Sequence, residues 1–250
     1  MRLKGRAALV TGATRGIGKA IAHALAREGA TVAVHYNAGE AAAQETANAI
    51  RDGGGGAFSV QADVSQHDEV ARMFAECRER MGGVDILVNN ARQLVKGRTF
   101  MEMSWEEDYE PQIQVMLKGA FHCCQAALPG MRERGWGRIV NVLSTVLGEK
   151  RARTNSYGAV KSALLYFSQN LAVEAGPYGV TVNMVSPGLT ETERPILHSD
   201  DYQREYVDAI PMKRLGRSED VGGAVVFFCS DEADYVTGVN MAVSGGKVIF

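Results

Sequence analysis

Tyr157 and Lys161 stand four residues apart in residues 156–175, whose composition predicts a helix. Side chains at positions i and i+4 share one face of a helix, so the phenol and the ammonium are expected to be neighbours. A neighbouring ammonium lowers a tyrosine pKa from its usual value of about 10, which would let Tyr157 exchange a proton with a carbonyl or hydroxyl group near neutral pH. Ser144 ends an earlier apolar run, where its hydroxyl could hydrogen-bond the same substrate oxygen. The three residues predict acid–base chemistry, although a Tyr-x-x-x-Lys pattern alone also fits an ordinary surface pair.

A glycine-rich turn early in the chain predicts the binding of a dinucleotide. Its glycines are spaced G-x-x-x-G-x-G within TGATRGIG at residues 11–18, between an apolar run at 7–10 and a helical pattern at 16–28. Glycines permit a tight turn and a close approach to a pyrophosphate, while the helix N-terminus supplies N–H groups and a partial positive charge. A tight turn without a ligand is the alternative, but the position directly after a first strand favours the cofactor.

The expected cofactor is NADPH rather than NADH. An NAD site carries an acidic residue about 20 residues beyond the glycines, to hold the ribose hydroxyls. The second predicted strand of this chain runs out at His35, Tyr36 and Asn37, with no acid. Arg15 lies inside the loop, where it could meet a 2′-phosphate; the alternative is a solvated residue at the start of the helix.

Seven short apolar runs predict the strands that position these residues. They are apolar throughout, which is typical of a parallel sheet with both faces covered. Nothing linker-like divides them, so we assign one dinucleotide-binding catalytic domain over residues 1–250. Residues 189–211 are polar and irregular in pattern, and are expected to form a substrate lid. The predicted strands are 7–10, 31–35, 57–61, 84–88, 138–143, 180–185 and 239–243, and the predicted helices are 16–28, 40–50, 68–81, 105–134, 156–175 and 219–229.

Bulk composition argues against several classes of function. The 27 Lys and Arg against 29 Asp and Glu give a formal net charge of −2, which disfavours nucleic-acid binding. The 4 cysteines and 5 histidines stand in no metal-ligand spacing, so no metal is expected. Apolar runs are too short for a signal peptide or a membrane span. We therefore expect a cytoplasmic protein that binds a small-molecule substrate, and neither nucleic acid nor membrane.

Further short motifs follow one another along the chain. After TGATRGIG come Asp63-Val64, Asn89-Asn90-Ala91, Ser144, Tyr157-Gly158-Ala159-Val160-Lys161, Asn183, Pro187-Gly188 and Gly245-Gly246. In this order, and over nearly the whole length, the chain resembles the short-chain dehydrogenase/reductase family. The resemblance implies a Rossmann-type doubly wound, seven-stranded parallel sheet flanked by helices on both faces. It also implies an NAD(P)H-dependent hydride transfer that reduces a carbonyl or oxidises the alcohol.

The same resemblance implies roles for individual residues. Tyr157 would be the general acid/base, Lys161 would hold the nicotinamide ribose and tune Tyr157, and Ser144 would orient the substrate oxygen. The adenine would meet Asp63 and Val64, and the nicotinamide carboxamide would meet Thr192. The full set implied for the cofactor is Gly12, Thr14, Arg15, Gly16, Ile17, Gly18, Asn37, Asp63, Val64, Asn90, Ala91, Tyr157, Lys161, Pro187, Gly188 and Thr192.

Two positions depart from the family pattern. The family usually has a glycine after Asn-Asn-Ala, where this chain has Arg92, which restricts the backbone and adds a long cation at the pocket mouth. The family usually has an asparagine, thought to support a proton-relaying water, where this chain has Met116, whose thioether cannot replace an amide. Either Met116 only fills core space, or the proton relay differs and activity on ordinary ketones is weak.

The segments expected to face the substrate are cationic, with Arg92, Lys96, Arg98, Lys150, Arg151 and Arg153. Cations clustered around a cleft attract anionic substrates, which would suit a role in specialised metabolism, but the alternative of solvated loop charges is slightly favoured. A carrier-protein-linked 3-oxoacyl reductase is a second reading, weakened where Gly135, Trp136 and Tyr178 interrupt the basic docking residues. A cofactor-binding scaffold or regulator with weakened catalysis is a third. By analogy with the family, we expect a homo-oligomer, most simply a homotetramer.

Overall fold

Seven parallel strands form the centre of the computed structural model, which describes residues 1–93, 96–193 and 200–250. The strand order is β3-β2-β1-β4-β5-β6-β9, so the order reverses between β1 and β4, where a crevice for a ligand opens. The predicted strands and the parallel sheet are confirmed, with ends that differ by at most two residues. The strands are β1 (Ala7–Val10), β2 (Thr31–Tyr36), β3 (Gly56–Gln61), β4 (Ile86–Asn89), β5 (Gly137–Val142), β6 (Val180–Pro187) and β9 (Asn240–Val243).

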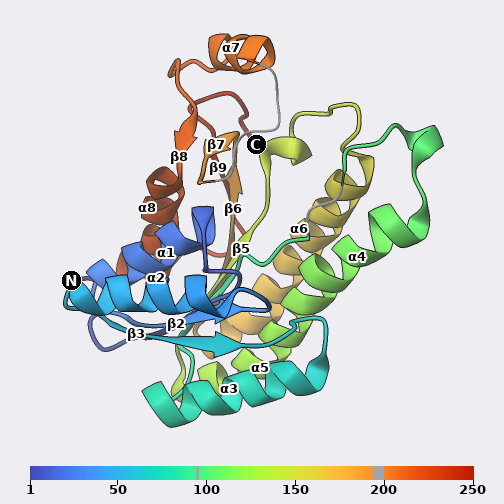
Figure 1. Ribbon diagram of the computed structural model, residues 1–250. Coiled ribbons are helices and arrows are strands. Elements are labelled where there is room, and N and C mark those ends of the chain that lie inside the picture. Colours follow the sequence, from blue (N-terminus) through green and yellow to red (C-terminus); the bar gives the residue numbers. More distant parts are fainter. Residues whose placement is uncertain (94–95, 194–199) are drawn as a thin grey trace.

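Helices cover both faces of the sheet, as the doubly wound prediction requires (Figure 1). Side chains alternate along a strand, so Ala8 and Val10 enter one core and Leu9 enters the other. None of the described helices combines the length and the apolar character that a membrane crossing requires. One face carries α1 (Gly16–Arg27), α2 (Glu40–Asp52) and α8 (Ser218–Cys229), and the other carries α3 (His67–Met81), α5 (Gly119–Arg134) and α6 (Asn155–Ala175).

The prediction of one helix over residues 105–134 is only partly right. Two π-helical turns, Trp105–Tyr109 and Ile113–Lys118, flank the short α4 (Glu110–Gln112), and regular α5 starts at Gly119. Apolar residues at helical spacing run through both kinds of turn, so periodicity alone could not separate them. Such turns are frequent at functional sites, and the second one carries Met116.

The prediction that residues 189–211 are irregular is wrong in two places. β7 (Thr190–Glu191) pairs with β8 (Gly216–Arg217), and α7 spans Asp200–Asp208. Residues 194–199 of the predicted lid lie outside the described part of the chain. α7 carries an apolar stripe that was not predicted: Tyr202, Tyr206 and Ile210 recur every four residues and pack in one small cluster with Leu215.

α7 is fastened to the segment between Ser144 and Tyr157. The Arg151 guanidinium donates to the hydroxyls of Tyr202 and Tyr206, each at 3.2 Å. It also pairs with Glu149, whose carboxylate lies 3.4 Å from the ammonium of Lys247. The Tyr206 hydroxyl accepts the N–H of Leu189 at 3.3 Å, which ties the segment after β6 into the same group.

Candidate active site

The carboxyl edge of the sheet collects the residues that the sequence assigns to the cofactor and to catalysis. Ligands of parallel sheets bind at this edge. Tyr157 and Lys161 reach it from the first turns of α6. The other residues follow their strands: Gly12, Thr14, Arg15, Gly16, Ile17 and Gly18 after β1, Asn37 after β2, Asp63 and Val64 after β3, Asn90 and Ala91 after β4, Ser144 after β5, and Pro187, Gly188 and Thr192 at or after the end of β6.

The β1–α1 turn is crowded at its glycines. Gly12 and Gly16 have φ of +63° and +53°, a left-handed conformation that favours glycine. A Cβ at Gly18 would lie 2.3 Å from the carbonyl oxygen of Gly12 and 2.4 Å from the amide nitrogen of Asn90. That amide donates to the carbonyls of Thr11 and Gly12, at 2.9 and 3.0 Å. The end of β4 therefore fixes the shape of the turn.

His35 also holds this turn, a role that the sequence analysis missed. Its Nδ1 accepts the N–H of Gly12 at 3.0 Å, and its Nε2 lies 2.9 Å from the carbonyl of Ala62. Burial lowers the pKa of His35 to about 4, so the ring is neutral and carries its proton on Nε2. A histidine in a largely apolar strand, two residues before the predicted cofactor contact Asn37, was the available signal.

A carboxylate lies at the N-terminus of α1, where a dinucleotide would place its pyrophosphate. The Gly16 N–H donates to Glu193 at 2.7 Å, and the Lys19 ammonium lies 3.8 Å from the same side chain. Although burial raises the pKa of Glu193, the N–H groups of Glu193 and Gly16 outweigh it and hold the pKa below its usual value. The turn thus already binds an anion, which fits a phosphate.

The part of the predicted cofactor site that would hold the adenosine is more exposed than the β1–α1 turn. Arg15 is the N-cap residue of α1, and both Arg15 and Asn37 are exposed. Asp63 is held by neighbouring groups, since its N–H donates to Glu69 at 2.7 Å and its carboxylate accepts the N–H of Ser65 at 2.9 Å. The crowded turn, the bound anion and the free-standing Arg15 together fit a nucleotide that carries phosphate groups.

Ser144 and Tyr157 lie at the same edge of the sheet. Ser144 caps the 3₁₀ turn Thr145–Leu147, with its hydroxyl 3.3 Å from the N–H of Val146. Burial raises the pKa of Tyr157, while the charge of Arg92 and the Ser144 hydroxyl lower it. Arg92 and Ser144 follow β4 and β5, so they act on the phenol from two neighbouring strands.

Lys161 is buried, and its ammonium donates to the carbonyl of Val142 at 2.7 Å. Burial, followed by the charge of Arg92, lowers the pKa of Lys161 to about 7. Burial raises the pKa of Tyr157, although Arg92 and Ser144 oppose that shift. The predicted lowering of the tyrosine pKa below its usual value is therefore wrong, because burial outweighs the neighbouring charges and a half-neutral lysine contributes little.

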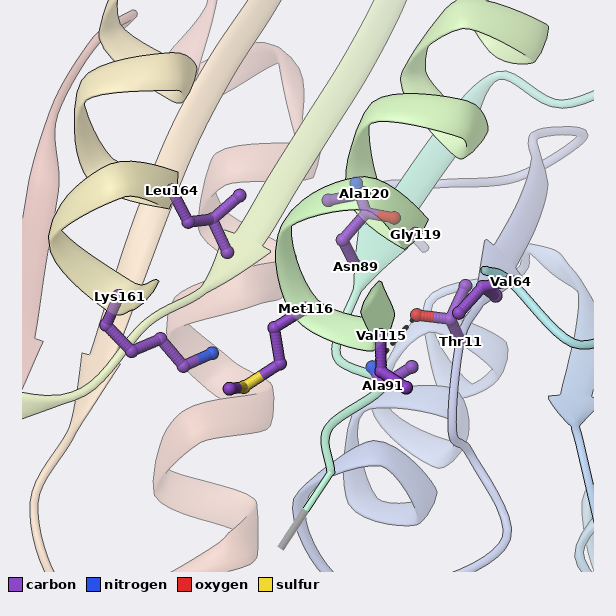
Figure 2. Close-up of a pocket in the computed structure, with 10 residues that line it drawn as sticks. All are labelled: Thr11, Val64, Asn89, Ala91, Val115, Met116, Gly119, Ala120, Lys161 and Leu164. Atoms are coloured by element: carbon purple, nitrogen blue, oxygen red, sulfur yellow. Dashed lines mark hydrogen bonds between the residues drawn. The ribbon is translucent and has the colours of Figure 1, made fainter. Parts of the chain in front are cut away.

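Met116 borders a small internal cavity beside Lys161. Figure 2 shows the thioether and the ammonium turned toward one another. The cavity measures about 10 Å³, close to the least volume that one water needs, and Thr11 and Asn89 are among its polar lining residues. Met116 itself is fully buried. Its thioether accepts hydrogen bonds only weakly and donates none, so it offers Lys161 no proton path.

A doubly wound parallel sheet with an anion-binding first turn and convergent Ser, Tyr and Lys side chains defines the class of dinucleotide-dependent oxidoreductases. Residues 12–247 match the family model described as enoyl-(acyl carrier protein) reductase. The chain belongs to the short-chain dehydrogenase/reductase family and is an oxidoreductase of that family, which confirms the predicted resemblance.

Similar proteins include two reductases. The chain is 39% identical to an acetoacetyl-CoA reductase of Allochromatium vinosum over 243 residues, covering 96% of this chain and 98% of that one. It is 37% identical to the 3-oxoacyl-[acyl-carrier-protein] reductase FabG of Staphylococcus epidermidis over 241 residues, again 96% and 98% of the two chains. Both relatives are named for the reduction of a carbonyl group.

Two solved structures share the fold over nearly the full length. The reductase LugOII, which catalyses keto-reduction at C1 during lugdunomycin biosynthesis, is 36% identical with a TM-score of 0.92, covering 100% of both chains. A gluconate 5-dehydrogenase from Burkholderia cenocepacia, in complex with NADP and tartrate, is 32% identical with a TM-score of 0.92, covering 98% and 96%. The gluconate dehydrogenase thus holds a nicotinamide cofactor on this fold.

Proposed function

We propose that the protein is an NADPH-dependent reductase of ketones, in which Tyr157 exchanges the proton and Ser144 holds the substrate oxygen. The observation that carries the proposal is the position of Ser144 and Tyr157 at the same sheet edge as an anion-binding turn. A nicotinamide bound at the turn would supply or accept the hydride. The two hydroxyls also argue against a scaffold with weakened catalysis, because packing alone requires neither of them.

The positions of Ser144, Tyr157 and Lys161 suggest a different role for each in the proposed reaction. The Ser144 hydroxyl, held at the start of a 3₁₀ turn, can donate to a carbonyl oxygen. The Tyr157 hydroxyl can give its proton to the same oxygen as negative charge develops there, and can take it back when an alcohol is oxidised. Lys161, fastened to the Val142 carbonyl, lies with its ammonium 5.7 Å from the centre of the Tyr157 ring and is placed to hold a ribose hydroxyl.

The preference for NADPH rests on Arg15 and on the missing acid near Asn37. Both side chains are exposed, so Arg15 is available to a 2′-phosphate. The NADP held by the related gluconate dehydrogenase supports this preference. Arg15→Ala should raise the Kd for NADPH about 10-fold and leave that for NADH nearly unchanged, as measured by cofactor fluorescence. Equal losses for both cofactors would contradict the preference.

The substrate proposal is a ketone that carries an anionic group. Two of the cations predicted to face the substrate are already paired with carboxylates. Arg98 pairs with Glu107 and Asp108, at 2.5 and 3.1 Å, and Arg151 pairs with Glu149. Arg153 is exposed and stands in a left-handed conformation, with φ of +64°. Arg153→Ala should therefore raise KM for carboxylate-bearing ketones and leave neutral ketones unchanged. Equal effects on both would exclude an anionic contact at this position.

Reduction of 3-oxoacyl thioesters is the second candidate, favoured by the similarity to the FabG and acetoacetyl-CoA reductases. Two basic residues at the end of α5 are already engaged: Arg134 lies 2.9 Å from Asp85, and Arg132 stacks 4.3 Å over Tyr178. That engagement weakens a carrier-protein docking role. Comparing kcat/KM for acetoacetyl-CoA with that for the same acyl group on a carrier protein decides between a carrier-linked and a carrier-independent enzyme.

The decisive experiment follows NADPH absorbance with a panel of aliphatic, aromatic and carboxylated ketones. Tyr157→Phe removes the proton donor and should lower kcat by about 10²- to 10⁴-fold. NADPH affinity of that variant should stay unchanged, which separates a lost chemical step from a lost fold. No turnover by the wild-type protein on any ketone or thioester would overturn the proposed reaction.

A homotetramer of cytoplasmic location completes the proposal. Apolar side chains stand exposed on α5 and α6, among them Phe121, Tyr166 and Val173, and Ile249 is exposed near the C-terminus. Such apolar surface is commonly covered by another subunit. Light scattering coupled to size-exclusion chromatography tests the assembly.

A further inference from the structure

The helix that carries Tyr157 has a weakly capped start. Within the part of the chain that the structure describes, the N-cap residue Thr154 makes no side-chain bond to the first turn of α6. The residues of that turn also include no acid to meet the helix dipole. Tyr157 is the third residue of the helix, so a displacement of this start displaces the phenol as well. The position of Tyr157 therefore depends on bonds from another element.

Residues 105–118, the π-helical segment, bond to the first two residues of α6 through two side chains. The Gln112 amide donates to the Ser156 hydroxyl at 2.8 Å. The Tyr109 hydroxyl donates to the side-chain oxygen of Asn155. Gln112 and Ser156 are both buried, so water does not compete for their bond, whereas the bond of Tyr109 is exposed. The stronger anchor of the helix start is therefore Gln112, bonded to the residue directly before Tyr157.

The Gln112 amide is itself held in place. Its nitrogen also donates to the backbone carbonyl of Asp108 at 2.6 Å, so both of its N–H bonds are used. The buried Asp108 carboxylate accepts the N–H of Ser104 at 3.0 Å and lies 3.1 Å from the guanidinium of Arg98. Gln112 ends α4 between two π-helical turns, and such turns are frequent at functional sites. The π-helical segment thus presents a fixed donor to α6.

Packing alone does not account for an amide at this position. The side-chain oxygen of Gln112 is buried and has no hydrogen-bond partner among the described residues. A buried acceptor without a partner costs stability, and a leucine would fill a similar volume without that cost. The glutamine is therefore explained by the two bonds that its nitrogen makes.

We propose that Gln112 is a positioning residue for Tyr157, which it holds through Ser156 in the geometry that proton transfer requires. The inference rests on the proposed function above. Met116, four residues beyond Gln112, borders the same cavity as Lys161 (Figure 2). The π-helical segment therefore meets α6 on both sides of Tyr157 in the chain. A displacement of about 1 Å at a reacting group is enough to lower a rate about 100-fold, so this support matters for turnover.

The kinetic test compares Gln112→Leu with Gln114→Leu. Gln114 is the matched control, because among the described residues its side chain bonds only to Glu110 and Lys118 of the same segment. Gln112→Leu should lower kcat about 10-fold, with KM and the Kd for NADPH within about 2-fold of the wild type. Gln114→Leu should leave kcat unchanged. Ser156→Ala removes the other partner of the bond and should lower kcat to the same extent, with no further loss in the double variant.

A second measurement needs no turnover. In NMR spectra of protein isotope-labelled at the tyrosine Cζ atoms, Tyr157→Phe identifies the Tyr157 signal. Gln112→Leu and Ser156→Ala should both shift or broaden that signal, because the phenol leaves its fixed position, whereas Gln114→Leu should not. An unmoved signal in Ser156→Ala would overturn the proposal, and this small change decides the matter even where Gln112→Leu folds poorly. A moved signal in a protein that reduces no ketone would overturn the proposed reaction and leave the positioning role standing.

Discussion

The candidate site has two halves that are built in different ways. The cofactor half, made of the β1–α1 turn with His35 and Asn90, is held by backbone N–H and carbonyl groups at distances near 3 Å. The proton half, made of Arg92, Tyr157 and Lys161, depends on burial and charge, which set the pKa values of Tyr157 and Lys161. Backbone crowding leaves almost no room for an added atom in the cofactor half. The properties of the proton half depend instead on which charged side chains surround Tyr157.

This difference explains where the chain departs from its family. Its glycine turn and Asn90 keep the family pattern, because the turn closes only around these residues. Arg92 belongs to the proton half, where its charge lowers the pKa of Tyr157 against the effect of burial, and Met116 borders that half beside Lys161. Changes of substrate are therefore expected to accumulate in the proton half.

The largest effect should come from adding a single methyl group to the cofactor half. In Gly18→Ala the new Cβ would lie 2.3 Å from the Gly12 carbonyl oxygen, so the turn must move. NADPH affinity should fall on the order of 100-fold, measured by fluorescence, as expected when a binding geometry shifts by about 1 Å. Gly223→Ala on α8 is the matched control, since its Cβ would meet no atom within 4 Å. Unchanged NADPH affinity in Gly18→Ala would show that the cofactor half is not limited by backbone crowding.

The next effect is on stability against pH, through His35. Burial holds its pKa at about 4, against about 6.5 when unfolded, so the unfolded chain binds the proton first as pH falls. The free energy of unfolding should therefore drop by about 3 kcal/mol between pH 6.5 and 4, and this contribution should be complete below pH 4. His35→Gln should lack that part of the slope in urea unfolding. An equal slope in both proteins would show that the turn does not depend on a neutral His35.

The smallest effect concerns the anion at the turn. Glu193→Gln removes the carboxylate that accepts the Gly16 N–H, so a phosphate no longer competes with a charge there. NADPH affinity should rise about 2- to 5-fold, in line with the energy of one charge at a helix N-terminus. Glu219→Gln, which removes a carboxylate from the same pocket, serves as the control. A weaker affinity in Glu193→Gln would mean that Glu193 supports the turn rather than competing with the cofactor.

Much of the fold could be predicted from the sequence, because each strand is a short apolar run closed by glycine or polar residues. Tyr157 and Lys161 could also be placed together, since helical spacing alone brings them to one face. α7 was missed because its stripe of Tyr202, Tyr206 and Ile210 lies among charged residues. The π turns around Met116 leave the apolar spacing unchanged and were not visible either.

The chemistry of the site was harder to predict than the identity of the residues that form it. Whether Arg92 reaches the Tyr157 hydroxyl depends on the direction of a side chain, and no spacing rule encodes that direction. The tyrosine pKa depends on how deeply the phenol lies, so the prediction from a neighbouring ammonium had the wrong sign. His35 was visible only as a strand residue, since its partner Gly12 lies 23 residues earlier.

The bonds from Arg151 to Tyr202 and Tyr206 have an evolutionary consequence. They join α7 to residues 149–153, two segments expected to face the substrate, so a substitution in α7 changes the setting in which residues 149–153 are selected. Mutations in the two walls should therefore be epistatic, each acceptable only against a particular partner. Libraries that vary both walls at once are expected to yield new specificities that stepwise scans of either wall would miss.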